Sequence, residues 1–266
     1  MIGVSYVVTY RSEGASRRAN LEAILAWLGQ FSGLEVTVVE QDRSPTISGV
    51  IIPGQGTHLF AFNPGAFNKS WGFNVGFKYS SGQVIAFGDA DVMVDAETLN
   101  QSFESCLSDY DAVKPYDRLI DLTPEETKQV LAGESPILMD GYGRSLNREG
   151  IGEYICFCGG LFVMRRALFE FLGGFDEKFL GWGAEDDAMT VKLHTLSQST
   201  QNLTGHTAYH LWHEQLPHRR FGQPFYQRNL ARLRQYQGLG PARMRILCER
   251  QRRSMGNIHK YAFPNP

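Results

Sequence analysis

FGDADVMV, residues 87–94, is the stretch that decides how the rest of the sequence is interpreted. Six of its eight residues are apolar or small, which is typical of the end of a buried strand, but Asp89 and Asp91 stand among them. A carboxylate is costly to remove from water unless a cation or a hydrogen-bond donor compensates for it. The stretch therefore raises the question of which cation, or which other chemistry, the two aspartates serve.

Strands and helices alternate around this stretch. Valine-rich segments at residues 3–10 and 34–40 predict two strands, and apolar residues at helical spacing predict a helix over 16–30 between them. A further helix is expected over 68–79, and a strand over 83–88 delivers the two aspartates. Because helices join successive strands, the sequence predicts an α/β fold with a mostly parallel central sheet flanked by helices.

The second half of the chain continues the alternation. Asp95 is a favourable N-cap for a helix to about residue 107, and Thr123 with Pro124 begins another over 122–131. The other elements expected are a long loop over 133–154, a strand over 155–164 interrupted by Gly159 and Gly160, a helix over 166–172, a strand over 207–213, and basic helices over 224–236 and 242–253. The two glycines leave room for something to approach the backbone closely.

Length and charge suggest one large domain with an extension. The 266 residues are 42% hydrophobic and 20% charged, which is ordinary for a globular protein, and the net charge of −2 gives no overall attraction to nucleic acid. From Glu214 onward, however, there are eleven Lys and Arg residues and two acidic ones. We expect a domain over 1–213 and, packed on it, a mobile loop and a basic helical extension over 214–266 that meets anions.

The cysteines and the N-terminus point to a reducing compartment. Cys156 and Cys158 do not have a zinc-binding spacing, would face opposite sides of a strand, and are expected to be free thiols like Cys106 and Cys248. The opening MIGVSYVVTYR has no signal-peptide pattern, and no stretch approaches the ~20 apolar residues that span a bilayer. The expected location is cytoplasmic.

Three groups of polar residues are candidates for chemistry. Asp89 and Asp91, at the carboxyl end of a strand, suit a hard divalent cation such as Mn²⁺ or Mg²⁺, although a turn cap would use the same residues. Glu185 and Asp186, with Asp187, open a helix, where acids are favourable in any case. They follow Gly181-Trp182-Gly183, however, and an exposed Trp beside a carboxylate is a common platform for a sugar.

The third group is a pair of histidines, His210 and His213. On one strand these two positions face opposite ways, so the pattern argues against a single metal bound by both. One of them could complete an Asp/His metal site, because imidazole suits Mn²⁺. The alternative for either is an ordinary core or edge histidine.

Taken together, these groups resemble the GT-A glycosyltransferases. The similarity spans roughly residues 3–213 and is greatest to the family 2, chondroitin-polymerase-like and β-1,4-galactosyltransferase branch. The segments that carry it are VVEQD (38–42), FNKSWGFNVGF (67–77), FGDADVMV (87–94), CGGLFVMRRALFEFLGGFDEKFLGWGAEDDAMTVKL (158–193) and TAYH (207–210). The resemblance implies a GT-A, Rossmann-like nucleotide-diphospho-sugar transferase domain over residues 1–213.

The resemblance also implies roles for residues in the catalytic centre. Asp91 and His210 would bind a metal ion, Mn²⁺ or Mg²⁺, that bridges the donor diphosphate, with Asp89 as a further ligand nearer the ribose. Asp186 would be the base that deprotonates the acceptor hydroxyl, and Glu185 would hold a sugar. The residues implied to bind the nucleotide sugar are Thr9, Tyr10, Arg11, Asp42, Lys69, Asp89, Gly160, Trp182 and His213.

The function implied is a metal-dependent, inverting glycosyltransferase. It would move a hexose or N-acetylhexosamine from a nucleotide sugar, a UDP-sugar first of all, to a hydroxyl of a glycan or lipid-linked acceptor. The alternatives are a retaining enzyme of the same fold, a sugar- or nucleotide-binding module without turnover, and a nucleotidyltransferase, for which TYRSEGAS (9–16) is a poor phosphate loop.

The basic C-terminal part has two interpretations. His218, Arg219 and Arg220 lie in a loop that would close over the donor, since related enzymes carry a lid at this place. The helices after it could touch anionic lipid headgroups at the inner face of the membrane. The alternative is a solvated or subunit-contacting pair of helices.

Overall fold

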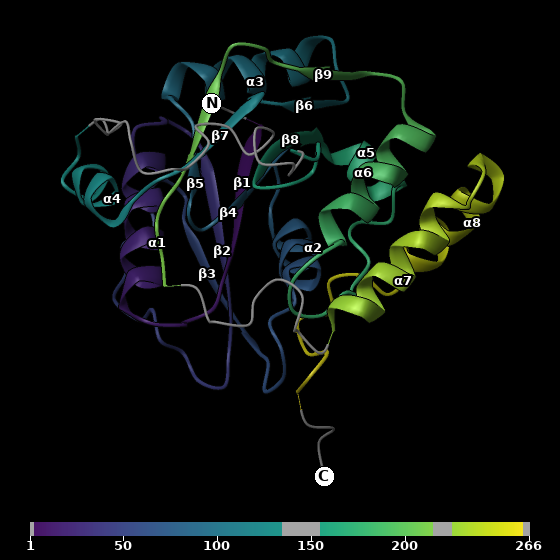
Figure 1. The fold of residues 1–266 in the computed structure, drawn as a ribbon, viewed down its shortest axis with the longest axis horizontal. Coiled ribbons are helices and arrows are strands. Elements are labelled where there is room, and N and C mark those ends of the chain that lie inside the picture. The colour runs from purple at the N-terminus through teal and green to yellow at the C-terminus, as the bar shows by residue number, and fades with distance from the viewer. Residues whose placement is uncertain (1–2, 135–154, 215–224, 263–266) are drawn as a thin grey trace.

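The computed structural model describes residues 3–134, 155–214 and 225–262 (Figure 1). At its centre is a seven-stranded sheet in the order β3-β2-β1-β4-β8-β6-β9. The strands are β1 (Val4–Tyr10), β2 (Glu35–Asp42), β3 (Thr57–Phe62), β4 (Val84–Asp89), β6 (Ala112–Lys114), β8 (Leu161–Arg165) and β9 (Thr200–Asn202). Strands β3, β2, β1 and β4 run parallel, and β8 lies antiparallel to both β4 and β6. The mostly parallel α/β sheet predicted from the sequence is confirmed.

Helices cover both faces of this sheet, so its central strands are buried on both sides. All seven residues of β1 are buried. Because side chains alternate along a strand, Tyr6 and Val8 belong to the core cluster under α1 (Ala15–Leu28) and α3 (Ala96–Ser108). Val7 belongs to the opposite cluster, under α2 (Lys69–Tyr79), α5 (Arg166–Phe171) and α6 (Glu185–Leu196). Figure 1 shows α1 and α2 on opposite sides of the strands.

A second, three-stranded sheet was not anticipated. It consists of β5 (Val92–Met93), β10 (Thr207–His210) and β7 (Arg118–Asp121), with β10 in the middle. His210 is paired in register with Val92 on one side and with Asp121 on the other. This small sheet joins the segment directly after Asp91 to the last strand described.

The predicted helix starts are confirmed by their caps. Asp95 accepts a hydrogen bond from the backbone N–H of Thr98 at the start of α3. Thr123 and Glu126 form a reciprocal capping box at the start of α4 (Pro124–Leu131). These ends could be predicted because a cap depends on residues three positions apart.

Two predicted strands are shorter than expected. Residues 155–160 form a turn, and β8 begins only at Leu161, because Gly160 takes a left-handed conformation with φ of 67°. Cys156 and Cys158 are therefore not on a strand, although they are free like the other cysteines described. Strand β10 ends at His210 instead of continuing to residue 213. The predicted loop over 133–154 lies, apart from residues 133 and 134, outside the described residues.

The two C-terminal helices pack beside α6. They are α7 (Tyr226–Gln237) and α8 (Pro241–Arg252), close to the predicted ranges, and they appear at the edge of Figure 1. Their inner faces form a core cluster with Phe179 and residues of α6. His218, Arg219 and Arg220 lie outside the described residues. None of the described helices is long and apolar enough to span a membrane.

Candidate active site

Asp91, His210 and His213 come together as a candidate metal-binding group. One ligand atom from each residue lies within 4.8 Å of the others. Nε2 of His210 is 3.6 Å from Oδ1 of Asp91, and Nε2 of His213 is 3.5 Å from Oδ2. Asp91 follows β4 and His210 ends β10. Strand pairing brings these two residues together although they are far apart in the sequence. One carboxylate and two imidazoles are a suitable donor set for a divalent ion.

The expectation that the two histidines face opposite ways is wrong. Alternation holds only within a strand, and β10 ends at His210. Beyond it the backbone N–H of Leu211 donates to the carbonyl of Asp91 over 2.8 Å, and that of Trp212 donates to the hydroxyl of Thr127. These two bonds turn the chain so that His213 returns to the carboxylate of Asp91.

The charges of this group favour an ionised Asp91. Burial raises the pKa of this carboxyl, but the nearby His210, Arg17 and His213 lower it well below its usual range. Burial lowers the pKa of His210, but Asp91 and Asp121 raise it to about 9. Burial lowers the pKa of His213. Asp91 is thus an anion around which cationic groups gather.

A second charged cluster surrounds Lys69, at the start of α2. Its ammonium lies 2.8 Å from Oδ1 of Asp89 and 3.0 Å from Oδ2 of Asp186. Burial lowers the pKa of Lys69, but Asp186 and Asp89 raise it well above its ordinary value. Lys69 therefore joins the first acid of the D-x-D to the acid predicted to be the base.

Glu185 and Asp186 occupy the first turn of α6, where Glu185 is buried and Asp186 is partly buried. Burial raises the pKa of Asp186 to about 6, against the opposing effect of Lys69. Burial and the charge of Asp186 raise the pKa of Glu185 to about 8. Within the described part of the chain, Oε2 of Glu185 and Oδ1 of Asp186 are buried and have no hydrogen-bond partner. Buried polar atoms normally have one, so these two oxygens are suited to receive a polar substrate.

The loop before α6 is held by α7. Trp182 is 43% exposed and stacks on Tyr226, with ring centroids 5.6 Å apart and planes 22° apart. The side-chain amide of Asn229 donates to the carbonyl oxygens of Leu180 and Gly183, at 3.0 Å each. These contacts fix the segment that leads into Glu185 and Asp186.

The residues at the end of β1 make contacts within the fold. Thr9 is buried, and its hydroxyl accepts a hydrogen bond from the amide of Gln41. Tyr10 is buried in the core. The guanidinium of Arg11 donates to backbone carbonyls of residues 41, 63 and 65. These contacts stabilise the rim of the sheet, and binding of the nucleotide by these residues stays a prediction.

Asp42 ends β2 and Gly160 precedes β8, both at the same end of the sheet as the end of β1. The carboxylate of Asp42 accepts a hydrogen bond from the backbone N–H of Arg43. A side chain at position 160 would meet the hydroxyl of Tyr116, since a Cβ there would be 2.4 Å from it. Glycine at 160 thus has a packing reason, and its contact with a nucleotide sugar stays a prediction.

Two residues of the site escaped the sequence analysis. Arg17, in the first turn of α1, donates to Oδ2 of Asp91 over 2.7 Å. Oδ1 of Asp121, at the end of β7, lies 2.6 Å from Nδ1 of His210. Arg17 stands in a stretch of polar residues and Asp121 in an unrecognised short strand, so neither has a local signal in the sequence.

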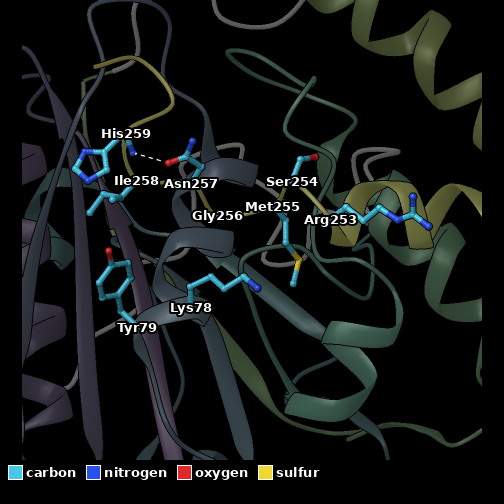
Figure 2. A pocket seen from close by; sticks show the side chains of 9 residues that line it. All are labelled: Lys78, Tyr79, Arg253, Ser254, Met255, Gly256, Asn257, Ile258 and His259. Carbon is cyan, nitrogen blue, oxygen red and sulfur yellow. Dashed lines mark hydrogen bonds between the residues drawn. The ribbon is translucent and has the colours of Figure 1, made fainter. Parts of the chain in front are cut away.

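A separate pocket of about 530 Å³ lies at the opposite end of α2 from Lys69. It is lined by Lys78, Tyr79 and residues 253–259, and Figure 2 shows Lys78 extending toward Met255. Its lining includes no carboxylate and none of the predicted site residues. The candidate site is therefore defined by its side chains, not by this pocket.

Comparisons with known proteins bear on the fold and on one segment. A family model described as the N-terminal domain of galactosyltransferase matches residues 150–214, which include Trp182, Glu185, Asp186, His210 and His213. No curated protein sequence matches the chain.

Solved structures resemble much more of the chain. The catalytic domain of Drosophila β1,4-galactosyltransferase 7 in complex with xylobiose is 18% identical with a TM-score of 0.52, over 86% of this chain and 79% of that one. TarS of S. aureus in complex with UDP-GlcNAc is 16% identical with a TM-score of 0.61, over 91% and 69%.

The mannosyltransferase PcManGT of Pyrobaculum calidifontis, in complex with GDP-Man and Mn²⁺, is 16% identical with a TM-score of 0.52, over 97% and 70%. At these identities the structural likeness establishes the fold, and the galactosyltransferase segment adds a family signal inside it. The resemblance noted in the sequence is confirmed: the chain has the GT-A fold, and the matched segment within that fold indicates a glycosyltransferase.

Proposed function

We propose that the protein is a metal-dependent inverting glycosyltransferase that uses a nucleotide sugar, foremost a UDP-sugar, as donor. The acceptor would be a hydroxyl of a glycan or of a lipid-linked glycan, and the sugar a hexose or N-acetylhexosamine. One observation carries the proposal. Lys69 contacts both Asp186 and Asp89, and Asp89 is two positions before Asp91 in the sequence. The candidate base is therefore linked to the group formed by Asp91, His210 and His213.

The donor atoms of the group fit Mn²⁺ better than Mg²⁺. Asp91, His210 and His213 would hold the ion, and two of the three ligands are imidazole nitrogens, whereas Mg²⁺ prefers oxygen. When bound, the ion would act as a Lewis acid toward the diphosphate of the donor. Asp89 lies outside the group and pairs with Lys69, so we assign it to the donor sugar or ribose.

Asp186 and Glu185 have environments that give them different roles. With a pKa of about 6, Asp186 is ionised at neutral pH yet more basic than an ordinary aspartate, which suits a general base. With a pKa of about 8, Glu185 is protonated under the same conditions and can donate a hydrogen bond to a sugar oxygen. Neighbouring acids with separated pKa values are typical of acid–base sites.

These positions support the following reaction. Asp186 takes the proton of the acceptor hydroxyl, and that oxygen attacks the anomeric carbon. The bond between this carbon and the diphosphate oxygen breaks, its electrons remain with the diphosphate, and Arg17 and Lys69 supply positive charge nearby. Attack opposite the leaving group inverts the anomeric configuration.

The neighbours support the classes of donor and ion. A mutant of the Drosophila enzyme was solved with manganese, UDP-Gal and xylobiose, TarS with UDP-GlcNAc, and PcManGT with GDP-Man and Mn²⁺. Nucleotide sugars and manganese thus recur on this fold, and two of these three structures contain a UDP-sugar.

We also propose a cytoplasmic location with peripheral contact at the inner face of the membrane. In the C-terminal part described, the arginines of α7 and α8 other than Arg232 are exposed, and Glu249 is the one acidic residue. Such a surface is attracted to anionic lipids. Binding of the full chain to vesicles with and without phosphatidylserine tests this, and equal binding to both would contradict it.

The test of the enzymatic function is a panel of UDP-, GDP- and dTDP-sugars with Mn²⁺, scored for nucleotide release. We expect release from one class of donor, abolished by EDTA, and in Asp186→Asn reduced by roughly 10²–10⁴-fold, the usual contribution of a general base. Full release by Asp186→Asn, or none with any donor, would contradict the proposal. The anomeric configuration of the product, read by NMR, decides between inversion and retention.

A further inference from the structure

We infer that Asp121 is a positioning residue for His210, fixing the imidazole so that Nε2 faces the metal-binding group. The inference rests on the proposed metal site and extends it by one residue that the sequence did not reveal. Its basis is the 2.6 Å contact between Oδ1 of Asp121 and Nδ1 of His210.

The small sheet places these two side chains next to each other. Strands β7 and β10 run parallel, and Asp121 and His210 are register partners. The backbone N–H of Leu122 donates to the carbonyl of His210 over 2.9 Å, which fixes this register at the strand ends. Partners in register on neighbouring strands project on the same face of a sheet. The contact therefore follows from the strand pairing.

The chemistry of the contact determines which nitrogen is available. An ionised carboxylate only accepts hydrogen bonds, so Nδ1 of His210 must carry the hydrogen toward Asp121. In a neutral imidazole the lone pair is then on Nε2, the nitrogen that lies 3.6 Å from Oδ1 of Asp91. A ligand histidine commonly donates its other N–H to an oxygen in this way.

His213 shows the same arrangement with a different oxygen. Its Nδ1 lies 3.1 Å from the backbone carbonyl of Glu214, and its Nε2 lies 3.5 Å from Oδ2 of Asp91. Both rings thus have Nδ1 held by an oxygen and Nε2 directed at the same carboxylate. This agreement between two independent ring environments distinguishes the pair from histidines that merely pack nearby.

Asp121 can be changed without opening the core. Its side chain is 44% exposed and is not part of a core cluster, so truncation removes no core side chain. The chain also offers a matched control in Asp117, which precedes the same strand and whose carboxylate accepts a hydrogen bond from the backbone N–H of Gly205. Asp117→Asn removes the same charge without altering the contact with His210.

The experiment is a titration of the full chain with Mn²⁺ alone, followed by electron paramagnetic resonance of the free ion. We expect Asp121→Ala to weaken Mn²⁺ binding by about 10–100-fold, the usual effect of losing such an outer partner. Asp121→Asn keeps an acceptor oxygen without the charge, so its affinity should lie between those of Asp121→Ala and wild type. Asp117→Asn should stay within about twofold of wild type.

A second readout separates orientation from stability. Co²⁺ at saturation should give a different visible spectrum in Asp121→Ala, because the orientation of His210 toward the ion changes. If Asp121→Ala does not fold, Asp121→Asn carries both measurements. Unchanged affinity and spectrum in both variants would overturn the inference, as would equal weakening by Asp117→Asn.

Measurements of Mn²⁺ binding and of sugar-nucleotide turnover separate a failure of this inference from a failure of the proposed function. If the wild-type protein does not bind Mn²⁺, the metal site fails and the role of Asp121 falls with it. If Mn²⁺ binds and depends on Asp121 but no sugar nucleotide is turned over, the inference stands and the catalytic proposal fails.

Discussion

Lys69 is the residue on which the charges around the candidate base depend. It lies between Asp89 and Asp186, which are 20 and 117 residues away in the sequence. Without a cation these carboxylates would repel each other, and burial would keep Asp186 protonated. A lysine here holds the base ionised near neutral pH.

Replacement of Lys69 by methionine should move the acid limb of the pH–rate profile for nucleotide release to higher pH. The ammonium favours the ionised form of Asp186, so its loss raises the pKa of Asp186 above about 6. For each unit by which the pKa of Asp186 rises, the loss of rate relative to wild type should be roughly tenfold greater below pH 6 than at pH 8.5.

The matched control for this change is Lys178→Met, an exposed lysine that precedes α6. It should leave the profile in place. If the acid limb of Lys69→Met lies at the same pH as that of the wild type, whatever the absolute rate, Lys69 does not lower the pKa of Asp186.

At the scale of elements, α7 is tied to the loop that leads into α6. Asn229 is buried and bonds two carbonyls of that loop, while Tyr226 stacks on Trp182. Ala184, the last residue before α6, has a φ of 72°, a conformation that costs energy for a residue other than glycine. The strained start of α6 is therefore maintained by contacts from a helix far along the chain.

Asn229→Ala should loosen this loop without disturbing the metal site. Two partly buried carbonyls lose their donor, a cost of at most about 1–3 kcal/mol each. We expect faster deuterium exchange over residues 180–184 and slower nucleotide release, with Mn²⁺ affinity unchanged.

Gln235→Ala, on the exposed side of the same helix, is the comparison and should behave as wild type. Unaltered exchange over residues 180–184 in Asn229→Ala would mean that α7 does not position the loop.

At the scale of the whole molecule, the candidate metal group brings together residues that are far apart in the sequence. Asp91 stands before β5, His210 ends β10 and His213 follows that strand, more than a hundred residues later. An ion held by all three would link the two sheets. Anything that binds the folded state alone stabilises it by mass action, by about 2.7 kcal/mol at a hundred times its Kd.

Mn²⁺ should accordingly raise the thermal unfolding midpoint, and more so at pH 8.5 than at pH 6. His210 has a pKa raised to about 9, so its protonated form stabilises the metal-free fold below about pH 6.5, and this contribution is lost as the pH rises through about 9. The ion must displace that proton, and it does so more easily at the higher pH.

Differential scanning calorimetry with Mn²⁺ against EDTA at the two pH values measures this difference. Mg²⁺ should give a smaller shift, and the double variant His210→Ala, His213→Ala should give none. An equal shift at both pH values, or one that survives in the double variant, would contradict binding at this group.

Much of the fold could be predicted because its signals are local. A buried strand appears as an apolar run, and a helix start appears as a cap with its partner three residues on, as at Asp95 and Thr123. The same holds for two parts of the site. Asp91 follows a strand end, and Asp186 opens a helix after a glycine-rich turn. The strands β3, β5, β6, β7 and β9 were not predicted, and the last four have only two to four residues, too few to show a period.

The sequence by itself determined three features of an α/β fold: aspartates at the end of a strand, a pair of acids at the start of a helix, and a histidine on the last predicted strand. Only the tertiary structure decided how they meet: His213 turned back beside His210, Lys69 lay between Asp89 and Asp186, and Asp121 lay beside His210. The physical reason is that strand pairing and the ends of strands set these contacts. Periodicity along the chain describes which face a side chain takes within one element, and it carries no information about which elements become neighbours.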